Sequence, residues 1–347
     1  MKNGKVTIKE VARAAGVSIT TVSRVLNSQE GQMTEDTRQR ILAAMDELHY
    51  VPNRLASSLK NERSHTLGVI VSNILNPFFT AVVRGIQDYV KPRGYEVFIC
   101  NTDDDPKEEA DYRRVLLSRR VDGLIVTNCG GDFSAYKKLV DQNYPLVLMD
   151  RRIKGLSCDS VVIDNAGICQ KVMERLIGLG HRRIGVITPP LDHIEPRLDR
   201  VQGCRKALRK HGMELAPELI REVNFHAETA ASEIRGLLAL KPAPTALFVL
   251  NTFLAIRALE ELDKLRVRIP DDLSFVMFDD PDWSEIVKPK IGAVRQPTYE
   301  IGKTAARLLL ERIERSGKRE EMVRLQAQFI ERESTGARNP SAGRRRG

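Results

Sequence analysis

Apolar residues recur at helical spacing near the start of the chain, where two short helices meet at a glycine. The pattern predicts a first helix whose buried face consists of Ile8, Val11, Ala12 and Ala15. After Gly16 it predicts a second helix that buries Val22, Val25 and Leu26. Thr7 with Glu10 three residues later forms a capping box, and Ser18 is placed to cap the second helix. Thr34 begins a third helix, which Pro52 stops.

The outer face of the second helix carries side chains that suit contact with DNA. It presents Ile19, Thr20, Ser23 and Arg24, which can touch methyl groups, phosphates and guanine edges. Two short helices about a glycine-containing turn, with a polar and basic outer face on the second, are typical of a helix-turn-helix. The alternative interpretation is a plain helical hairpin with a solvated face. The agreement of caps, turn and period favours DNA binding.

From Thr66 onward the pattern changes to buried strands that alternate with amphipathic helices. A first series of predicted strands covers 67–71, 95–100, 122–126 and 145–149. A second series covers 161–163, 183–187, 245–250, 274–278 and 291–294. Strand–helix alternation predicts an α/β fold with doubly wound parallel sheets, and the two series predict two similar lobes.

Composition and charge narrow the class of protein. The 347 residues suffice for two or three domains, and 42% apolar with 29% charged residues is ordinary for a globular chain. A net charge of +9 favours a polyanionic partner, although part of it lies in the basic stretch 337–347, which we expect to be disordered. The five widely spaced cysteines predict reduced thiols. Because no apolar signal segment or membrane-length run is present, we expect a cytoplasmic protein without membrane association.

Sequence signatures of enzymes are absent. There is no GxxxxGK[ST] phosphate loop, no GxGxxG after a strand, no GxSxG elbow, no HExxH and no cluster with metal-ligand spacing. His181 falls at a helix-to-strand turn, where a structural role is expected. We therefore predict no catalytic residue, no metal and no cofactor.

Polar and aromatic side chains follow the ends of several predicted strands, where open α/β sheets bind ligands. These strand-end candidates are 72–79, 150–152, Arg197, Arg200, Phe225, Asn251, Asp279 and Asp280. Each has a simpler interpretation, because an arginine after a strand is often a surface ion pair and a phenylalanine is often part of a core.

The head of the chain resembles the LacI/GalR family of bacterial transcriptional regulators. The matching stretches are TIKEVARAAGVS, TVSRVLN, TEDTRQRILAAMDELHYVPN and ASSLK. The resemblance extends from Val6 to about Thr335, and one departure is the loop 28–33, which is a residue longer than in many members. It implies a helix-turn-helix head, a hinge helix, and a two-lobed body like the type I periplasmic binding proteins, with a homodimer bound to pseudo-palindromic operator DNA.

The resemblance also implies boundaries and DNA contacts. We expect a head at 1–51, a hinge and linker at 52–65 and a body at 66–336. The chain is expected to cross between lobes near Ile163, Arg295 and Met322, which gives a first lobe of 66–163 and 296–322 and a second of 164–295 and 323–336. The expected DNA-binding residues are Thr7, Ser18, Ile19, Thr20, Thr21, Ser23, Arg24, Asn27, Asn53, Arg54, Ala56, Leu59 and Lys60. Leu59 is the expected minor-groove wedge, against the alternative of a plain polar linker.

For the effector, the resemblance implies contacts at Asn76, Phe78, Arg151, Arg200, Phe225, Asn251 and Asp279. DRRIKGL and SNILNPFF also resemble the sugar-acid branch of the family, typified by regulators of ketodeoxygluconate breakdown. Since arginine binds a carboxylate in a planar fork, Arg151 or Arg200 is the expected partner of a sugar-acid carboxylate, ahead of a neutral sugar or a purine. The predicted function is a repressor of a carbohydrate or sugar-acid operon. The alternatives are a solute-binding protein of a transporter and an α/β enzyme.

Overall fold

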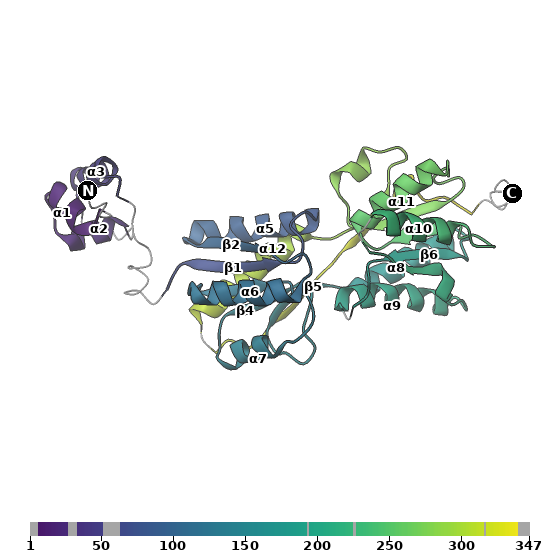
Figure 1. Cartoon of the computed structure of the whole chain (residues 1–347), viewed down its shortest axis with the longest axis horizontal. Helices are drawn as coiled ribbons and strands as arrows, with labels where there is room; N and C mark the ends of the chain where they lie inside the picture. Colours follow the sequence, from purple (N-terminus) through teal and green to yellow (C-terminus); the bar gives the residue numbers. More distant parts are fainter. Residues whose placement is uncertain are drawn as a thin grey trace. The chain divides into compact units, whose positions relative to one another are not determined.

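The fold is described from a computed structural model of the chain (Figure 1). The structure describes residues 6–26, 33–50, 63–192, 194–224, 227–315 and 317–338. Contacts divide the chain into two compact units, a head within 1–64 and a body within 65–347. Each unit is described by itself.

Three described helices make the head: α1 (Ile8–Ala14), α2 (Ile19–Leu26) and α3 (Glu35–Glu47). The predicted caps are present, because the Thr7 amide donates to Glu10 Oε2 at 2.7 Å and the Thr21 amide donates to Ser18 Oγ at 3.1 Å. The Thr37 amide likewise donates to Thr34 Oγ1 at 3.4 Å. The small core consists of Val11, Ala12, Ala15, Val22, Val25, Ile41 and Ala44.

The first lobe of the body is built on a sheet whose six described strands are all parallel, in the order β11-β5-β4-β3-β1-β2. Its strands are β1 (Thr66–Val71), β2 (Glu96–Asn101), β3 (Gly123–Val126), β4 (Leu146–Met149), β5 (Asp159–Ile163) and β11 (Met322–Leu325). Its helices are α5 (Pro77–Val90), α6 (Pro106–Ser118), α7 (Ser134–Asp141) and α12 (Thr298–Glu314), with a 3-10 turn at Lys91–Arg93.

The second lobe repeats this plan in the order β12-β10-β9-β8-β6-β7. Its described strands are β6 (Ile184–Thr188), β7 (Ile220–Glu222), β8 (Ala246–Val249), β9 (Ser274–Phe278), β10 (Gly292–Arg295) and β12 (Gln328–Ile330). Its helices are α8 (Asn165–Gly178), α9 (Glu195–Lys210), α10 (Ala227–Leu238) and α11 (Thr252–Lys264), with 3-10 turns at Pro217–Leu219 and Asp282–Glu285. The sheet is not wholly parallel, since β12 runs antiparallel to β10.

The chain passes between the lobes at three places (Figure 1). The first two lie at the ends of β5 and β10, next to Ile163 and Arg295. The third lies between β11 and β12 rather than near Met322, because Met322–Leu325 pairs with β5 and extends the first sheet. The same pairing pattern corrects the assignment of 161–163 to the second series, since β5 pairs with β4 in the first lobe.

One strand is less buried than its sequence predicts. The apolar run 95–100 predicts a buried strand, but β2 lies at the edge of its sheet, and the side chains of Phe98 and Ile99 are 46% and 40% exposed. All five cysteines lie in the described ranges and none is in a disulfide, as expected. His181 has the predicted structural role, because its ring nitrogens hydrogen-bond Thr245 and Ser274. No described helix is long and apolar enough to cross a membrane.

Candidate functional site

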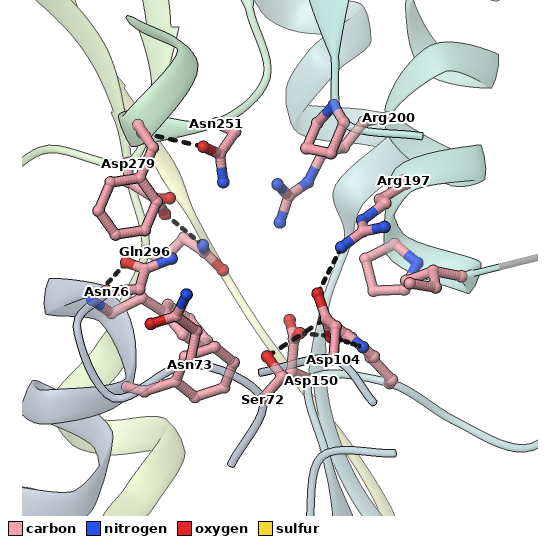
Figure 2. A pocket seen from close by; sticks show the side chains of 17 residues that line it. Ser72, Asn73, Asn76, Asp104, Asp150, Arg197, Arg200, Asn251, Asp279 and Gln296 are labelled. Atoms are coloured by element: carbon pink, nitrogen blue, oxygen red, sulfur yellow. Dashed lines mark hydrogen bonds and ion pairs between the residues drawn. The ribbon is translucent and has the colours of Figure 1, made fainter. Parts of the chain in front are cut away.

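A cavity of about 620 Å³, open to solvent, lies where strand ends of both sheets face each other (Figure 2). Its walls combine residues that follow β1, β2 and β4 of the first lobe with residues of α9, α11 and the end of β9 in the second lobe. Its lining residues are Ser72, Asn73, Asn76, Phe78, Phe79, Asp104, Asp150, Arg151, Pro189, Ile194, Pro196, Arg197, Arg200, Asn251, Phe253, Asp279 and Gln296. Its place, outside the carboxyl ends of the strands, is typical of a small-molecule site in an α/β protein.

Six of the seven predicted effector residues line this one cavity: Asn76, Phe78, Arg151, Arg200, Asn251 and Asp279. The seventh, Phe225, lies outside the described residues. Within the described parts of the chain, no group of histidine, cysteine and carboxylate side chains could hold a metal ion.

The two asparagines are helix caps, one in each lobe. Asn76 Oδ1 accepts from the Phe78 amide at 3.0 Å at the start of α5, and Asn251 Oδ1 accepts from the Phe253 amide at 2.9 Å at the start of α11. Because each carbonyl oxygen accepts a cap hydrogen bond, its direction is fixed, and the side-chain amide of each asparagine remains as a donor for the cavity.

Arg200 points from α9 into the cavity (Figure 2). Its Nε donates to Asn165 Oδ1 at 2.8 Å, its Nη1 donates to the Leu250 carbonyl at 3.1 Å, and the guanidinium lies 3.6 Å from the centre of the Phe278 ring. These contacts fix the plane of the group. Among the described residues no carboxylate forms an ion pair with it, although the carboxyl groups of Asp150 and Asp279 lie near enough for its charge to oppose the rise that burial causes in their pKa values. Its charge therefore remains available to a ligand.

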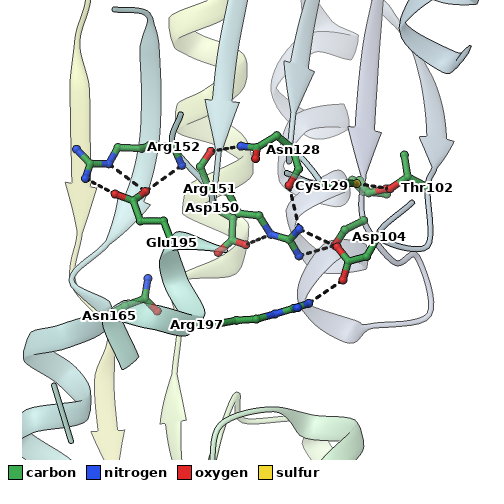
Figure 3. A network of polar contacts seen from close by, with 12 residues as sticks. Thr102, Asp104, Asn128, Cys129, Asp150, Arg151, Arg152, Asn165, Glu195 and Arg197 are labelled. Atoms are coloured by element: carbon green, nitrogen blue, oxygen red, sulfur yellow. Dashed lines mark hydrogen bonds and ion pairs between the residues drawn. The ribbon is translucent and has the colours of Figure 1, made fainter. Parts of the chain in front are cut away.

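Arg151 is already engaged inside the protein (Figure 3). Its Nη1 donates to Asp104 Oδ1 at 2.7 Å and to the Asn128 carbonyl at 2.9 Å, and its Nη2 donates to Ser72 Oγ at 3.3 Å. Burial lowers the pKa of Arg151, but Asp104 and Asp150 more than offset this and raise it above its ordinary value. Both terminal nitrogens thus have internal partners, which leaves Arg200 as the better-placed cation.

Two partly buried carboxylates stand at matching places in the lobes. Asp150 directly follows β4 and Asp279 directly follows β9, both with positive φ, of 65° and 72°. Gln296 Nε2 donates to Asp279 Oδ1 at 2.6 Å. Burial raises the pKa of both carboxyl groups above the ordinary value, against the opposing charge of Arg200. Carboxylates held in this way are acceptors for ligand hydroxyl groups.

Several residues that line the cavity are not among the seven predicted effector contacts. Asp104 follows β2, and Gln296 lies on the second passage between lobes, with a buried Oε1 that has no hydrogen-bond partner. Arg197 donates from α9 to Asp104 Oδ2 at 2.8 Å and so joins the lobes. A second ion pair between the lobes connects Arg152 with Glu195 (Figure 3). The strand-end rule could have found Asp104, whereas nothing local identifies Gln296.

In the head, the outer face of α2 presents Ile19, Thr20 and Arg24, with Ile19 44% exposed. Thr21 and Ser23 lie half-buried beside them. Thr7 and Ser18 are exposed and cap α1 and α2. The other predicted DNA-binding residues fall outside the described part of the chain: Asn27, Asn53, Arg54, Ala56, Leu59 and Lys60.

Comparison with known proteins gives both parts of the chain a family. Residues 7–53 match the bacterial regulatory proteins of the lacI family, and residues 173–335 match the periplasmic binding protein-like domain. The probable HTH-type transcriptional regulator EndR of Paenibacillus polymyxa is 37% identical over 310 residues, which cover 89% of this chain and 91% of that protein. The HTH-type transcriptional regulator KdgR of Bacillus subtilis is 30% identical over 341 residues, which cover 95% and 98%.

The fold agrees with a solved structure of the same kind. The lac repressor dimer bound to operator and the anti-inducer ONPF matches with a TM-score of 0.82 and 27% identity, over 96% of this chain and 100% of that one. The head, the two-lobed body and the full-length relatives lead to one conclusion. This chain is a helix-turn-helix transcriptional regulator and belongs to the LacI family.

Proposed function

We propose that the cavity between the lobes binds the effector of this regulator, and that the effector is a sugar acid whose carboxylate pairs with Arg200. The observation that carries the proposal is the state of Arg200, which is held by Asn165, the Leu250 carbonyl and the Phe278 ring but has no carboxylate partner among the described residues. A cation in a partly enclosed site is costly without a counterion, and guanidinium matches a carboxylate in a planar fork.

The remaining polar groups of the cavity suit the hydroxyl groups of a sugar. Asp150, Asp279 and Gln296 Oε1 can accept hydrogen bonds, and the side-chain amides of Asn76 and Asn251 can donate them. Phe78 adds an apolar surface for C–H groups. Donors and acceptors thus come from both lobes, so a bridging ligand would contact the two at once.

A neutral sugar is the second candidate, and one observation favours it. The cavity is lined by three arginines and by three aspartates, Asp104, Asp150 and Asp279, so its formal charges balance without a ligand. A carboxylate ligand would give the cavity one excess negative charge, and protonation of Asp150 or Asp279, whose pKa values burial raises, would remove it.

Calorimetry with gluconate, glucose and glucitol tests the proposal, since glucitol is the uncharged open-chain counterpart of gluconate and glucose is the cyclic neutral sugar. Gluconate should bind more tightly to the wild-type protein. Arg200→Met should lose roughly ten- to hundredfold in gluconate affinity, corresponding to about 1.5–3 kcal/mol for hydrogen bonds to a charged group. The matched control is Arg205→Met on the exposed side of the same helix, which should change nothing. Equal or tighter binding of either neutral compound would refute the charge argument.

For the DNA side, we propose that the outer face of α2 reads the operator and that 52–65 serves as the hinge between the head at 1–51 and the body. A dimer of this chain would place two heads on the half-sites of a pseudo-palindromic operator in the cytoplasm. A gel shift on the DNA upstream of its own gene tests this. The complex should form with that DNA and resist an excess of random competitor, and equal competition would contradict sequence-specific binding.

A further inference from the structure

Two arginines from opposite lobes converge on a single carboxylate at one end of the cavity. Arg151 Nη1 lies 2.7 Å from Asp104 Oδ1, and Arg197 Nη2 lies 2.8 Å from Asp104 Oδ2 (Figure 3). The side chains of Arg151 and Arg197 are only 7% and 12% exposed. All three residues line the cavity.

This arrangement has the chemistry of an anion site. Guanidinium groups on two sides of one carboxylate or phosphate are a common way to bind such ligands, because each contributes charge-assisted hydrogen bonds. Here the chain itself supplies the anion. Burial raises the pKa of Asp104, but Arg151 and Arg197 more than offset this and hold it below its ordinary value, so the group stays ionised.

The two cations depend on that anion. Burial and repulsion from Arg151 lower the pKa of Arg197, while Asp104 opposes both effects. Arg151 also keeps one buried N–H, at Nε, without a hydrogen-bond partner. Without Asp104, two nearly buried guanidinium groups would face the cavity, and among the described residues only Arg151 would keep an ion pair, with Asp150.

We propose that Asp104 is a built-in counterion that determines specificity, by filling an anion subsite and so restricting the cavity to effectors with one anionic group. The inference rests on the proposed function, because it concerns the same cavity. A second carboxylate or a phosphate ester at this end would lie beside the Asp104 carboxylate. The repulsion between two like charges about 4 Å apart, at an effective dielectric constant of 20, corresponds by itself to roughly a thousandfold in an association constant, and the attraction of Arg151 and Arg197 offsets part of it.

The first test uses inorganic phosphate as the probe and needs no knowledge of the effector. Asp104→Ser removes the carboxylate and leaves space between Arg151 and Arg197. Phosphate, compared with chloride at equal ionic strength, should raise the melting temperature of Asp104→Ser but not that of the wild-type protein. The matched control is Glu195→Ser, which removes the other carboxylate between the lobes. Its partner Arg152 is 40% exposed, so phosphate should give no comparable gain.

Asp104→Asn keeps the shape of the side chain and serves where the serine variant does not fold. The same phosphate-dependent rise is expected. If neither variant folds even in phosphate, or if phosphate stabilises Glu195→Ser equally, the counterion role is wrong, because that role predicts that a free anion replaces the lost one.

The second test concerns specificity and compares gluconate with the dicarboxylate glucarate by calorimetry. The wild-type protein should prefer gluconate, and Asp104→Ser should gain at least about tenfold for glucarate relative to gluconate. An unchanged ratio would overturn the inference. Failure of the proposed function looks different, because the wild-type protein would then bind no sugar acid while phosphate still stabilised Asp104→Ser.

Discussion

Gly203→Ala should separate α8 from α9 and disturb the cavity one turn away. A Cβ atom on Gly203 would lie 2.2 Å from the Ala166 carbonyl oxygen, 2.9 Å from its carbonyl carbon and 3.0 Å from its Cα. All three atoms belong to the backbone of α8, so no side-chain rotation can relieve the clash. Ordinary contact begins near 3.4 Å, which requires the helices to separate by about 1.2 Å.

The cost of this separation can be worked from the contacts. Overpacking a core typically destabilises a protein by about 1–3 kcal/mol, whereas the higher helix propensity of alanine than of glycine stabilises it by about 1 kcal/mol. The Arg200–Asn165 bond, at 2.8 Å, joins the same two helices and would stretch beyond hydrogen-bonding distance. Its loss adds about 1.5–3 kcal/mol. We expect a net destabilisation of about 1.5–5 kcal/mol, together with weaker effector binding.

Gly236→Ala in α10 is the matched control, because nothing lies within 4 Å of the Cβ position. It should stabilise the protein by about 0.5–1 kcal/mol through helix propensity alone. Thermal and urea denaturation of both variants measure the difference, and calorimetry measures effector affinity. If Gly203→Ala is as stable as Gly236→Ala and binds effector normally, the close packing of α8 and α9 does not position Arg200.

The other two predictions concern the head and a buried carboxyl group. Arg24→Ala should weaken operator binding by about 1–3 kcal/mol and leave binding to random DNA nearly unchanged, as measured by gel shift; equal losses on both would make Arg24 a phosphate contact. Asp279→Asn should stabilise the protein at neutral pH, because burial raises the folded-state pKa of Asp279 and its charged form is therefore unfavourable. The gain in stability of Asp279→Asn should shrink as the pH falls through that raised pKa, and it should vanish below the unfolded-state pKa. Urea denaturation across this pH range measures it, and a wild-type protein more stable than the variant at pH 7 would contradict the prediction.

The gathering of predicted residues around one cavity follows from simple topology. Parallel strands place their carboxyl ends at the same edge of a sheet, so side chains that follow β1 and β4 gather in the first lobe and those that follow β8 and β9 gather in the second. The two groups line one cavity because the lobes face each other. Sequence and resemblance therefore located the cavity without any contact information. The sequence could not assign the role of each side chain, because the direction of the Asn251 carbonyl oxygen decides whether this residue binds a ligand or caps α11.

What escaped the sequence depends on partners far apart in the chain. Asp104 and Arg197 are separated by 93 positions and meet only because the two lobes face each other. Asp104 also accepts a hydrogen bond from Arg151, so the guanidinium of Arg151, an expected ligand contact, already has a partner within the protein. The third passage between lobes was misplaced for a similar reason, because only pairing with β5 identifies Met322–Leu325 as a strand of the first sheet.

The first turns of α9 carry two residues that form ion pairs between the lobes, together with Arg200, which has no ion pair with a carboxylate among the described residues. Glu195 pairs with Arg152, Arg197 pairs with Asp104, and Arg200 lies three residues further along, on the same face of the helix as Arg197. Because these residues lie in adjoining turns of one helix, a shift of α9 on ligand binding would move Arg200 together with both ion-paired residues. The affinity of an anionic effector should therefore depend on Arg197, although no contact between Arg197 and the ligand is required.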